Sequence, residues 1–418
     1  MEKKLGRYSM GIGDRFGRQG RAQISAFVTA RERHDIEVTP VWNKSFREHS
    51  MIGSVPGDVR KEADAAVEAA GWGQAYFVDA DHINLKTVEP FIASSDFFTL
   101  DVAEDIGVEA PSAEVDAFVK RHAALCGTID LPGRERPITV GHEDLLRVAK
   151  QYLSAVLHAR RIYQVISAVK TEGAFVTEVS MDETETAQSP EDMLIILAAI
   201  ADAGIPAATI APKFSGRFNK GVDYVGDIAA FTDEFDADLA VLHYAVDAFD
   251  LPADLKLSVH SGSDKFALYP VINRLLKEHG AGVHLKTAGT TWLEEIIGMA
   301  LAGGEGLEIA REVYTSAYKR VDALCEPYAT VIDIDRKSLP SADEVRRWSG
   351  PRLAETVRHD PANPAFNANV RQLLHVGYKV AAEMGPRYLD ALDACEESVA
   401  ECVAGNILQR HILPLFAV

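Results

Sequence analysis

Tyr76-Phe-Val-Asp-Ala-Asp-His82 is a short run of strand-forming residues that ends on a histidine. Two other runs have the same pattern, Leu257-Ser-Val-His260 and Gly282-Val-His284, and a fourth, Ala174-Phe-Val-Thr-Glu178, ends on a carboxylate. Parallel α/β folds place their chemistry at the carboxyl ends of strands, however far apart these lie in the sequence. Imidazoles and carboxylates gathered there would form an open divalent-metal site with acid–base groups beside it.

Short β-like runs alternate with helical patterns up to about residue 300, which indicates βα units and a parallel sheet. Nine runs are candidate strands: 7–11, 37–42, 75–78, 97–102, 174–179, 207–210, 238–242, 256–259 and 282–285. A (β/α)8 TIM-like barrel has places for only eight strands, so we expect one of the nine to be wrong. A doubly wound sheet fits less well, because Gly11-Ile-Gly-Asp-Arg-Phe-Gly17 has the wrong spacing for a dinucleotide loop.

Two helix boundaries are well marked. Gly71 is a plausible C-cap for an amphipathic helix over 58–70. Ser189 and Pro190 start another helix, with the serine as N-cap and the proline in the first helical position.

The chain divides into a barrel and a helical region. We predict a catalytic barrel over 1–302 and a helical C-terminal extension over 303–418 that packs on it, because strand signals nearly vanish after residue 303. Residues 103–142 interrupt the βα alternation with three prolines and several charges, which predicts an insertion after the fourth strand and a candidate lid.

Composition narrows the class of protein. Hydrophobic residues make up 47% of the 418, enough for a large core, and the formal net charge of −19 argues against a nucleic-acid partner. We expect no membrane partner, because no apolar stretch is long enough to span a bilayer. The four cysteines have no metal-finger spacing and are expected to be reduced thiols in a cytoplasmic protein. The oligomeric state stays open, and a homo-oligomer is compatible with the sequence.

The first candidate catalytic residues lie just after the third strand-like run and near the end of the fifth. Strict alternation would send Asp79 and Asp81 to one face and His82 to the other, whereas a turn would let Asp81 and His82 point into one site. Helix capping is the bland alternative for Asp81. Glu178 lies among strand formers, where a buried carboxylate is costly unless it meets a cation or exchanges a proton.

Polar clusters after the last two strands are candidate ligand-binding segments. In Ser258-Val-His260-Ser-Gly-Ser-Asp-Lys265, small residues let a ligand approach the backbone, so we assign Ser261, Ser263, Asp264 and Lys265 to substrate binding.

The next cluster, His284-Leu-Lys286-Thr-Ala-Gly-Thr-Thr, contributes Lys286 and Thr290 for substrate oxygens, and Lys213 is a further candidate for a carboxylate. Among Asp182, Glu183 and Glu185, a solvated acidic loop is the better interpretation for at least two. His243 ends a strand-like run but has no polar residues next to it in the sequence. We assign no function to the remaining histidines, which fall in predicted helices or loops.

Five segments together resemble the tagaturonate epimerase family, whose members are metal-dependent enzymes that interconvert tagaturonate and fructuronate in hexuronate catabolism. The segments are Tyr8-Ser-Met-Gly-Ile-Gly-Asp-Arg-Phe16, Phe77-Val-Asp-Ala-Asp-His82, Thr177-Glu-Val-Ser-Met-Asp-Glu-Thr184, Val259-His-Ser-Gly-Ser-Asp-Lys265 and His284-Leu-Lys-Thr-Ala-Gly289. They span most of the predicted barrel, and the last two are specific.

The resemblance implies a divalent cation, of the type of Mn, Ni, Zn, Co or Fe, held by His82, His260 and His284. It further implies a small sugar acid as substrate, Asp81 as proton acceptor and Glu178 as proton donor. Two alternatives stay open: a Schiff-base aldolase that uses Lys286 or Lys213, and a sugar-acid-binding protein without turnover.

Overall fold

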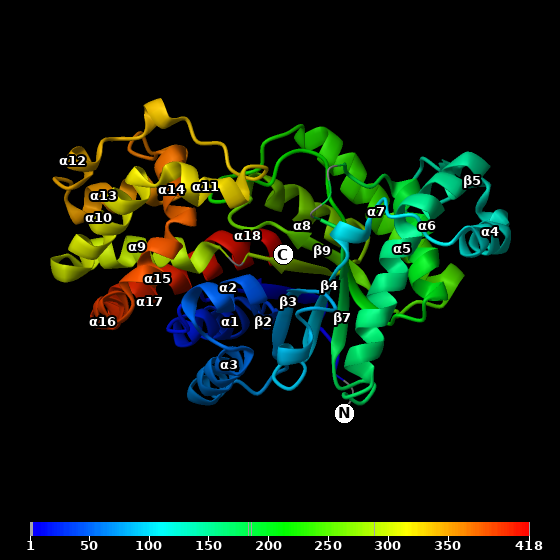
Figure 1. The fold of residues 1–418 in the computed structure, drawn as a ribbon, viewed down its shortest axis with the longest axis horizontal. Coiled ribbons are helices and arrows are strands. Elements are labelled where there is room, and N and C mark those ends of the chain that lie inside the picture. The colour runs from blue at the N-terminus through cyan, green and yellow to red at the C-terminus, as the bar shows by residue number, and fades with distance from the viewer. Residues whose placement is uncertain (1–2, 183, 185, 288, 418) are drawn as a thin grey trace.

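The computed structural model describes residues 3–417 apart from 183, 185 and 288, and in this part eight parallel strands close into a barrel. Their order around the barrel is β1-β10-β9-β8-β7-β4-β3-β2, with helices outside (Figure 1). The strands are β1 (Tyr8–Ile12), β2 (Thr39–Ser45), β3 (Phe77–Ile83), β4 (Phe97–Asp101), β7 (Val176–Ser180), β8 (Ala207–Ala211), β9 (Lys256–His260) and β10 (Val283–Lys286). The predicted (β/α)8 fold is confirmed.

α-Helices follow every barrel strand except β3, which is joined to β4 by a 3-10 turn (Glu89–Phe91), and they cover the barrel. They are α1 (Gly20–His34), α2 (Phe46–Ile52), α3 (Pro56–Ala70), α5 (His142–Ser167), α6 (Pro190–Asp202), α7 (Ile228–Phe249), α8 (Tyr269–Glu278) and α9 (Thr290–Ala302). Both predicted boundaries are confirmed. Gly71 ends α3 with a left-handed φ of 61°, and the Ser189 side chain accepts a hydrogen bond from the backbone N–H of Asp192 at the start of α6.

One predicted strand, 238–242, is wrong, and the residues belong to α7. A short apolar run cannot by itself be told from a buried helix segment, and here the wider pattern decides. Phe231, Phe235, Leu239 and Leu242 are buried at helical spacing, and the Asp227 side chain caps the helix start. His243 is therefore a helix residue and does not reach the end of a strand.

The barrel interior is apolar only at its bottom. Six side chains form a cluster of their own there: Leu5, Val41, Phe77, Phe97, Val176 and Ala208. Bulky branched residues usually fill such a barrel from end to end. In this chain, polar residues follow the apolar ones toward the carboxyl ends of the strands, and Ser9, Thr99, Glu178 and His284 are all fully buried.

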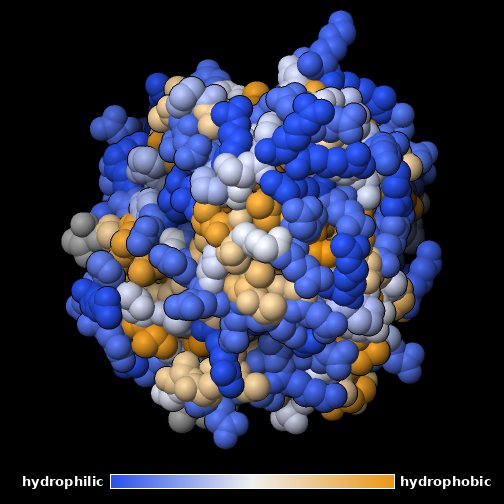
Figure 2. All heavy atoms as spheres, turned by 90° about the vertical axis from the view of Figure 1, so that its left-hand side faces the viewer, coloured by the Kyte–Doolittle hydropathy of each residue, from blue (hydrophilic) through white to orange (hydrophobic). Residues whose placement is uncertain are grey.

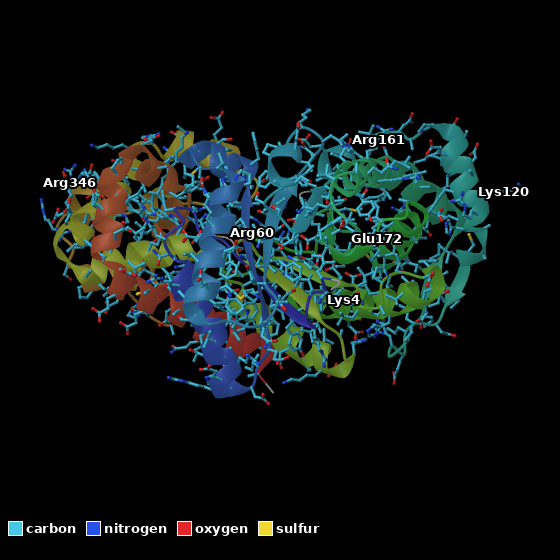
Figure 3. The ribbon with its side chains drawn as sticks, turned by 90° about the horizontal axis from the view of Figure 1, so that it is seen from below. Lys4, Arg60, Lys120, Arg161, Glu172 and Arg346 are labelled. Carbon is cyan, nitrogen blue, oxygen red and sulfur yellow. The ribbon has the colours of Figure 1, made fainter. Side chains whose placement is uncertain are left out.

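Residues between β4 and α5 do not contribute to the barrel sheet. They form α4 (Ser112–Arg121) and an antiparallel pair of short strands, β5 (Gly127–Ile129) and β6 (Ile138–Val140). This part and the C-terminal helices lie at opposite ends of the molecule (Figure 1). Figure 3 shows Lys120 at one end and Arg346 at the other.

The chain after α9 is helical and packs on the barrel helices, with α9 in contact with α10, α13 and α17. Its helices are α10 (Gly304–Lys319), α11 (Val321–Cys325), α12 (Ala342–Val345), α13 (Gly350–Val357), α14 (Ala368–Val376), α15 (Tyr378–Met384), α16 (Pro386–Ala394), α17 (Glu396–Gly405), a π-helical segment (Asn406–Ile412) and α18 (Leu413–Phe416). The outer face at this end is mostly hydrophilic and is interrupted by several apolar areas, one of them near its centre (Figure 2). None of the described helices is both long and apolar enough to cross a membrane.

A buried ionic network ties this helical region to the segment after β9. The Oδ2 atom of Asp264 accepts hydrogen bonds from Nη2 of Arg371 at 2.6 Å and from Nδ1 of His359 at 3.1 Å. Its Oδ1 atom accepts from the Thr290 hydroxyl at 3.1 Å and lies 3.2 Å from Nε2 of His411. Burial opposes ionisation of Asp264, but Arg371, His359 and His411 together outweigh it and hold the pKa of the carboxyl well below its usual range.

Replacing Arg371 with Met should destabilise the protein by about 3–5 kcal/mol, because removal of one member of a buried ion pair leaves the other as an uncompensated charge. Denaturant unfolding measures the change. The exposed pair Arg320–Glu383 offers a matched control, and Arg320→Met should change the unfolding free energy by no more than about 1 kcal/mol. Equal stability of the two variants would contradict the anchoring role of Asp264.

Candidate active site

Strand β3 has an irregular end that brings two consecutive side chains to the barrel mouth. Its register with β4 shifts between Ala80 and Ile83. His82 has a φ of 51°, in the left-handed region that residues other than glycine seldom adopt. Bulges of this kind change the direction of side chains, and they are frequent beside active sites. Asp81 and His82 consequently lie side by side, with 2.9 Å between Oδ1 and Nδ1.

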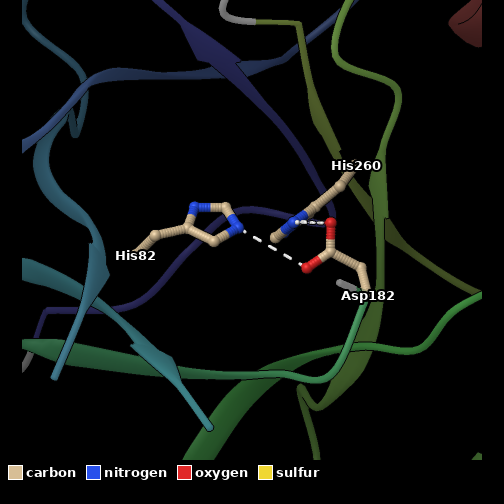
Figure 4. Close-up of side chains that lie close together, drawn as sticks. All are labelled: His82, Asp182 and His260. Carbon is tan, nitrogen blue, oxygen red and sulfur yellow. Dashed lines mark ion pairs between the residues drawn. The ribbon is translucent and has the colours of Figure 1, made fainter. Parts of the chain in front are cut away.

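Three side chains at the mouth form a compact group, His82, Asp182 and His260 (Figure 4). Oδ1 of Asp182 lies 3.5 Å from Nε2 of His82, and Oδ2 lies 3.1 Å from Nδ1 of His260. The hydroxyl of Ser180 donates a hydrogen bond to Asp182 at 2.6 Å and fixes the carboxylate. One potential ligand atom from each of the three residues lies within 4.8 Å of the others, close enough to share one ion.

Each imidazole of this group uses its other nitrogen to contact a carboxylate. Nδ1 of His82 lies 2.9 Å from Asp81, and Nε2 of His260 lies 2.8 Å from Oε1 of Glu178. Metal-binding histidines are commonly held in this way, because a carboxylate on one ring nitrogen leaves the second nitrogen for the metal. Here the second nitrogens, Nε2 of His82 and Nδ1 of His260, are buried and face the Asp182 carboxylate, with which neither forms a well-aligned hydrogen bond.

These donors fit a divalent transition-metal ion. Two imidazole nitrogens without a hydrogen-bond partner face one carboxylate, which is the two-histidine, one-carboxylate set that binds such ions and leaves other coordination positions open. Nitrogen and oxygen donors of this kind are compatible with Mn, Fe, Co, Ni and Zn.

The electrostatics of the group also favour a cation. Burial opposes protonation of His260, but the carboxylates of Asp182 and Glu178 outweigh it and raise its pKa to about 9. The pKa of His82 is raised well above its ordinary value by Asp81 and Asp182 against the same burial. A divalent ion would replace the protons of two histidines that the surrounding carboxylates already hold in a cationic form.

His284, predicted as the third histidine ligand, lies outside this group. Its Nδ1 atom is hydrogen-bonded to the Ser9 hydroxyl at 2.9 Å, and its ring packs on Phe97, which belongs to the apolar bottom of the barrel. Burial and the cations Lys286 and His260 lower the pKa of His284 to about 3, although Glu178 opposes them. In this structure Asp182, and not His284, completes the group of candidate ligands with His82 and His260.

A buried ammonium joins the two predicted catalytic carboxylates. Nζ of Lys286 lies 3.0 Å from Asp81, 2.9 Å from Glu178 and 3.0 Å from Asp79. The Thr99 hydroxyl accepts from the same ammonium at 2.7 Å. Alternating inward positions of β3, β4, β7 and β10 thus meet in one layer above the apolar bottom.

The charges of this layer are shared unequally. Burial opposes the ammonium, but Asp79, Glu178 and Asp81 outweigh it and raise the pKa of Lys286 well above its usual value. Burial also opposes ionisation of Glu178, yet Lys286 and His260 hold its pKa well below the usual range. For Asp79 burial prevails and raises the pKa to about 6, although Lys286 acts in the opposite direction.

Two predicted substrate-binding residues have their polar groups engaged within the protein. The fully buried Nζ of Lys265 donates to the backbone carbonyls of Asn219 and Val222 and to the hydroxyl of Ser263. Ser263 also accepts from the backbone N–H of Gly221. These bonds fix the segments after β8 and β9 against each other, and all three donors of Lys265 are used without a substrate.

The other predicted substrate-binding residues form hydrogen bonds within the protein and do not contact the buried group of Lys286, Asp79, Asp81 and Glu178. Ser261 donates to the backbone carbonyl of Lys286, and Thr290 donates to Asp264. Lys213 is half-buried in the segment after β8, where its backbone N–H donates to Gln188. Of the predicted substrate-binding set, the structure brings only Lys286 together with Asp81, Glu178 and the metal-ligand candidates.

Sequence reasoning missed two acidic side chains of the site. Asp182 belongs to a run of three acidic residues of which the sequence predicts at least two to be solvated without saying which, and the other two, Glu183 and Glu185, lie outside the described residues. The position of Asp182, two residues after the end of β7, could have identified it as a site residue, since His82 and His260 also lie at strand ends. Asp79 was recognised only as a neighbour of Asp81, although two inward carboxylates on one strand require a cation nearby.

Comparisons with known proteins identify similar sequences and a similar fold. Residues 2–392 match the family described as tagaturonate epimerase, UxaE. A tagaturonate/fructuronate epimerase of Thermotoga maritima is 28% identical over 97% of this chain and 80% of its own length. A glycerol complex of the fructuronate-tagaturonate epimerase UxaE from Cohnella laeviribosi shares the fold, with a TM-score of 0.80 and 24% identity over 99% of this chain and 82% of that one.

Removal of Asp182 should weaken Mn²⁺ binding more than removal of His284. We expect Asp182→Ala, His82→Ala and His260→Ala each to exceed the 10- to 100-fold loss that is typical when a residue supporting a ligand is removed. His284→Ala should leave the affinity within a few fold of wild type. Titration of chelator-stripped protein with Mn²⁺ measures both. Loss of binding in His284→Ala with binding retained in Asp182→Ala would restore the three-histidine set.

Proposed function

The chain belongs to the tagaturonate epimerase family, and we propose that it interconverts D-tagaturonate and D-fructuronate by inverting C4 with the help of a divalent metal ion. The main support for this proposal is that Lys286 contacts both Asp81 and Glu178. The same two carboxylates also contact and orient His82 and His260. One mouth of the barrel thus gathers acid–base groups and metal-ligand candidates.

The position of the epimerised carbon limits the mechanism. The ketone is C2, so the C4 hydrogen is β to the carbonyl and is not acidified by it. Enolisation would instead invert C3. Transient oxidation at C4 would need a redox cofactor, and the sequence has no convincing nicotinamide-binding motif. Cleavage and reformation of the C3–C4 bond inverts C4 without either difficulty, and we propose this retro-aldol route.

The steps of this route balance with the residues at hand. A carboxylate, Asp81 in the forward direction, takes the proton of the C4 hydroxyl, C4 becomes an aldehyde, and the electron pair of the C3–C4 bond moves into an enediolate over C2 and C3. A half-turn of the aldehyde presents its other face, the bond reforms, and the C4 oxygen recovers a proton. A divalent ion would supply Lewis-acid stabilisation of the charge on the ketone oxygen.

Asp81 and Glu178 are suited to exchange roles. Lys286 donates hydrogen bonds to both carboxylates. When one carboxylate gains a proton and loses its negative charge, the other can remain ionised and paired with the same ammonium. The depressed pKa of Glu178 means that it donates only a proton that it has first received, which agrees with a reversible reaction. We therefore assign Asp81 as acceptor and Glu178 as donor in one direction, and the reverse in the other.

The same contacts argue against Lys286 as the nucleophile of a Schiff-base aldolase. A lysine must be neutral to attack a carbonyl, whereas three carboxylates keep Lys286 protonated and raise its pKa. Borohydride should therefore trap no substrate on Lys286.

Chelator-stripped protein should convert tagaturonate to fructuronate only after a divalent ion such as Mn²⁺ or Ni²⁺ is restored. Chromatography of the two sugars measures the conversion, and Asp81→Asn should lower kcat by about 10²- to 10⁴-fold because it removes the acid–base group. Full activity in chelator would contradict the metal requirement. Tight binding without product at any metal would instead identify a sugar-acid-binding protein.

Tagaturonate that carries deuterium at C4 should keep it through epimerisation, because the retro-aldol route never breaks the C4–H bond. Mass spectrometry of the fructuronate formed in ordinary water measures the retention. Washout of the label to solvent would contradict the C3–C4 cleavage and require direct proton exchange at C4.

A further inference from the structure

Strand β2 points one amide side chain into the barrel. Trp42 faces outward, since its Nε1 donates to Gln23 of α1 at 3.0 Å. Val41, the residue before it, belongs to the apolar bottom of the barrel. Because side chains alternate along a strand, Asn43 points inward like Val41 and lies one layer nearer the mouth.

The amide of Asn43 is buried without a partner. Its exposed fraction is 1%, and neither Nδ2 nor Oδ1 has a hydrogen-bond partner among the described residues. A buried amide that makes no hydrogen bond costs stability, and native proteins seldom retain one without a reason.

Asn43 is next to the acid–base layer. In the β2–β3 register it pairs with Asp79, whose carboxylate contacts Lys286 at 3.0 Å. On the other side of β2, strand β1 contributes Gly11, where an added Cβ would lie 3.0 Å from Cγ of Lys286. The amide thus faces the interior next to Asp79, and the neighbouring strand β1 provides no side chain at Gly11, the partner of Val41.

Two more polar atoms of the same interior lack hydrogen-bond partners in the described part of the chain, Oγ of Ser258 and Nε2 of His284. Ser258 and His284 are register neighbours on β9 and β10. Ser258, His284 and Asn43 thus provide uncharged hydrogen-bond donors and acceptors around the buried group of Lys286 and its carboxylates. A hydroxyl both donates and accepts a hydrogen bond, so a polyol chain matches such groups.

We propose that Asn43 is a substrate-binding residue that hydrogen-bonds a hydroxyl of the sugar acid and orients the chain over Lys286 and the carboxylates. This inference rests on the proposed function for the identity of the ligand. Its amide can donate from Nδ2 and accept at Oδ1, so a single side chain can fix a hydroxyl in one orientation. A neutral group serves this purpose without disturbing the balance between Lys286 and its carboxylates.

The test compares catalysis with stability in the metal-loaded full-length protein. For Asn43→Leu, an apolar change of similar size, kcat/KM for tagaturonate should fall about 10- to 100-fold. Its urea unfolding midpoint should stay equal to that of wild type or rise, because no unpaired amide remains. Asn43→Ala, which adds no bulk, should show a similar loss of kcat/KM.

Asn273→Leu is the matched control. Asn273 donates to the backbone carbonyls of Leu415 and Ala417 at 2.8 and 3.1 Å, so its replacement should lower the unfolding midpoint and leave kcat/KM unchanged. Unchanged kcat/KM in both Asn43 variants, or their failure to fold, would overturn the assignment of Asn43. A wild-type protein that does not convert tagaturonate would instead refute the proposed function, and the assigned ligand with it.

Discussion

The buried ammonium of Lys286 holds together the interior of this barrel. It faces three carboxylates from two other strands, and the apolar bottom of the barrel excludes the solvent that would otherwise screen them. One ammonium among three carboxylates leaves an excess of negative charge, which burial makes expensive. The raised pKa of Asp79 is one response to this excess, and the raised pKa values of His82 and His260 are another. A divalent ion at the mouth would be a third.

The helical region after α9 contributes to the site although it supplies none of the candidate catalytic or metal-binding residues. Arg371 from α14 and His411 from the π-helical segment meet Asp264, four residues after His260. The strand end that carries His260 is therefore held from both sides, by the barrel and by the extension. In the described part of the chain, the C-terminal helices therefore stabilise the segment that follows His260.

The residues that periodicity could identify are those on strand ends. His82, His260 and Glu178 follow apolar runs, and the closed parallel barrel brings them together, as the sequence predicts. Asp182 lies beyond its strand in an acidic segment, where composition suggests solvent, and only tertiary structure shows that two histidines face it. Asn43 has no sequence signal, because an asparagine in a strand is noticed only when its lack of partners is seen. The wrong strand prediction at 238–242 and the correct ones all rest on short apolar runs. The sequence does not show whether such a run pairs with other strands or packs as a helix.

The three metal-ligand candidates come from parts of the barrel that are not hydrogen-bonded neighbours. β4 lies between β3 and β7, and β8 lies between β7 and β9. An ion shared by His82, Asp182 and His260 would therefore act as a cross-link around the barrel mouth, and binding at 100 times its dissociation constant would add about 2.7 kcal/mol to folding stability. Scarcity of the metal in a cell would then reduce the lifetime of the protein as well as its rate, since proteases degrade the less stable, metal-free chain first.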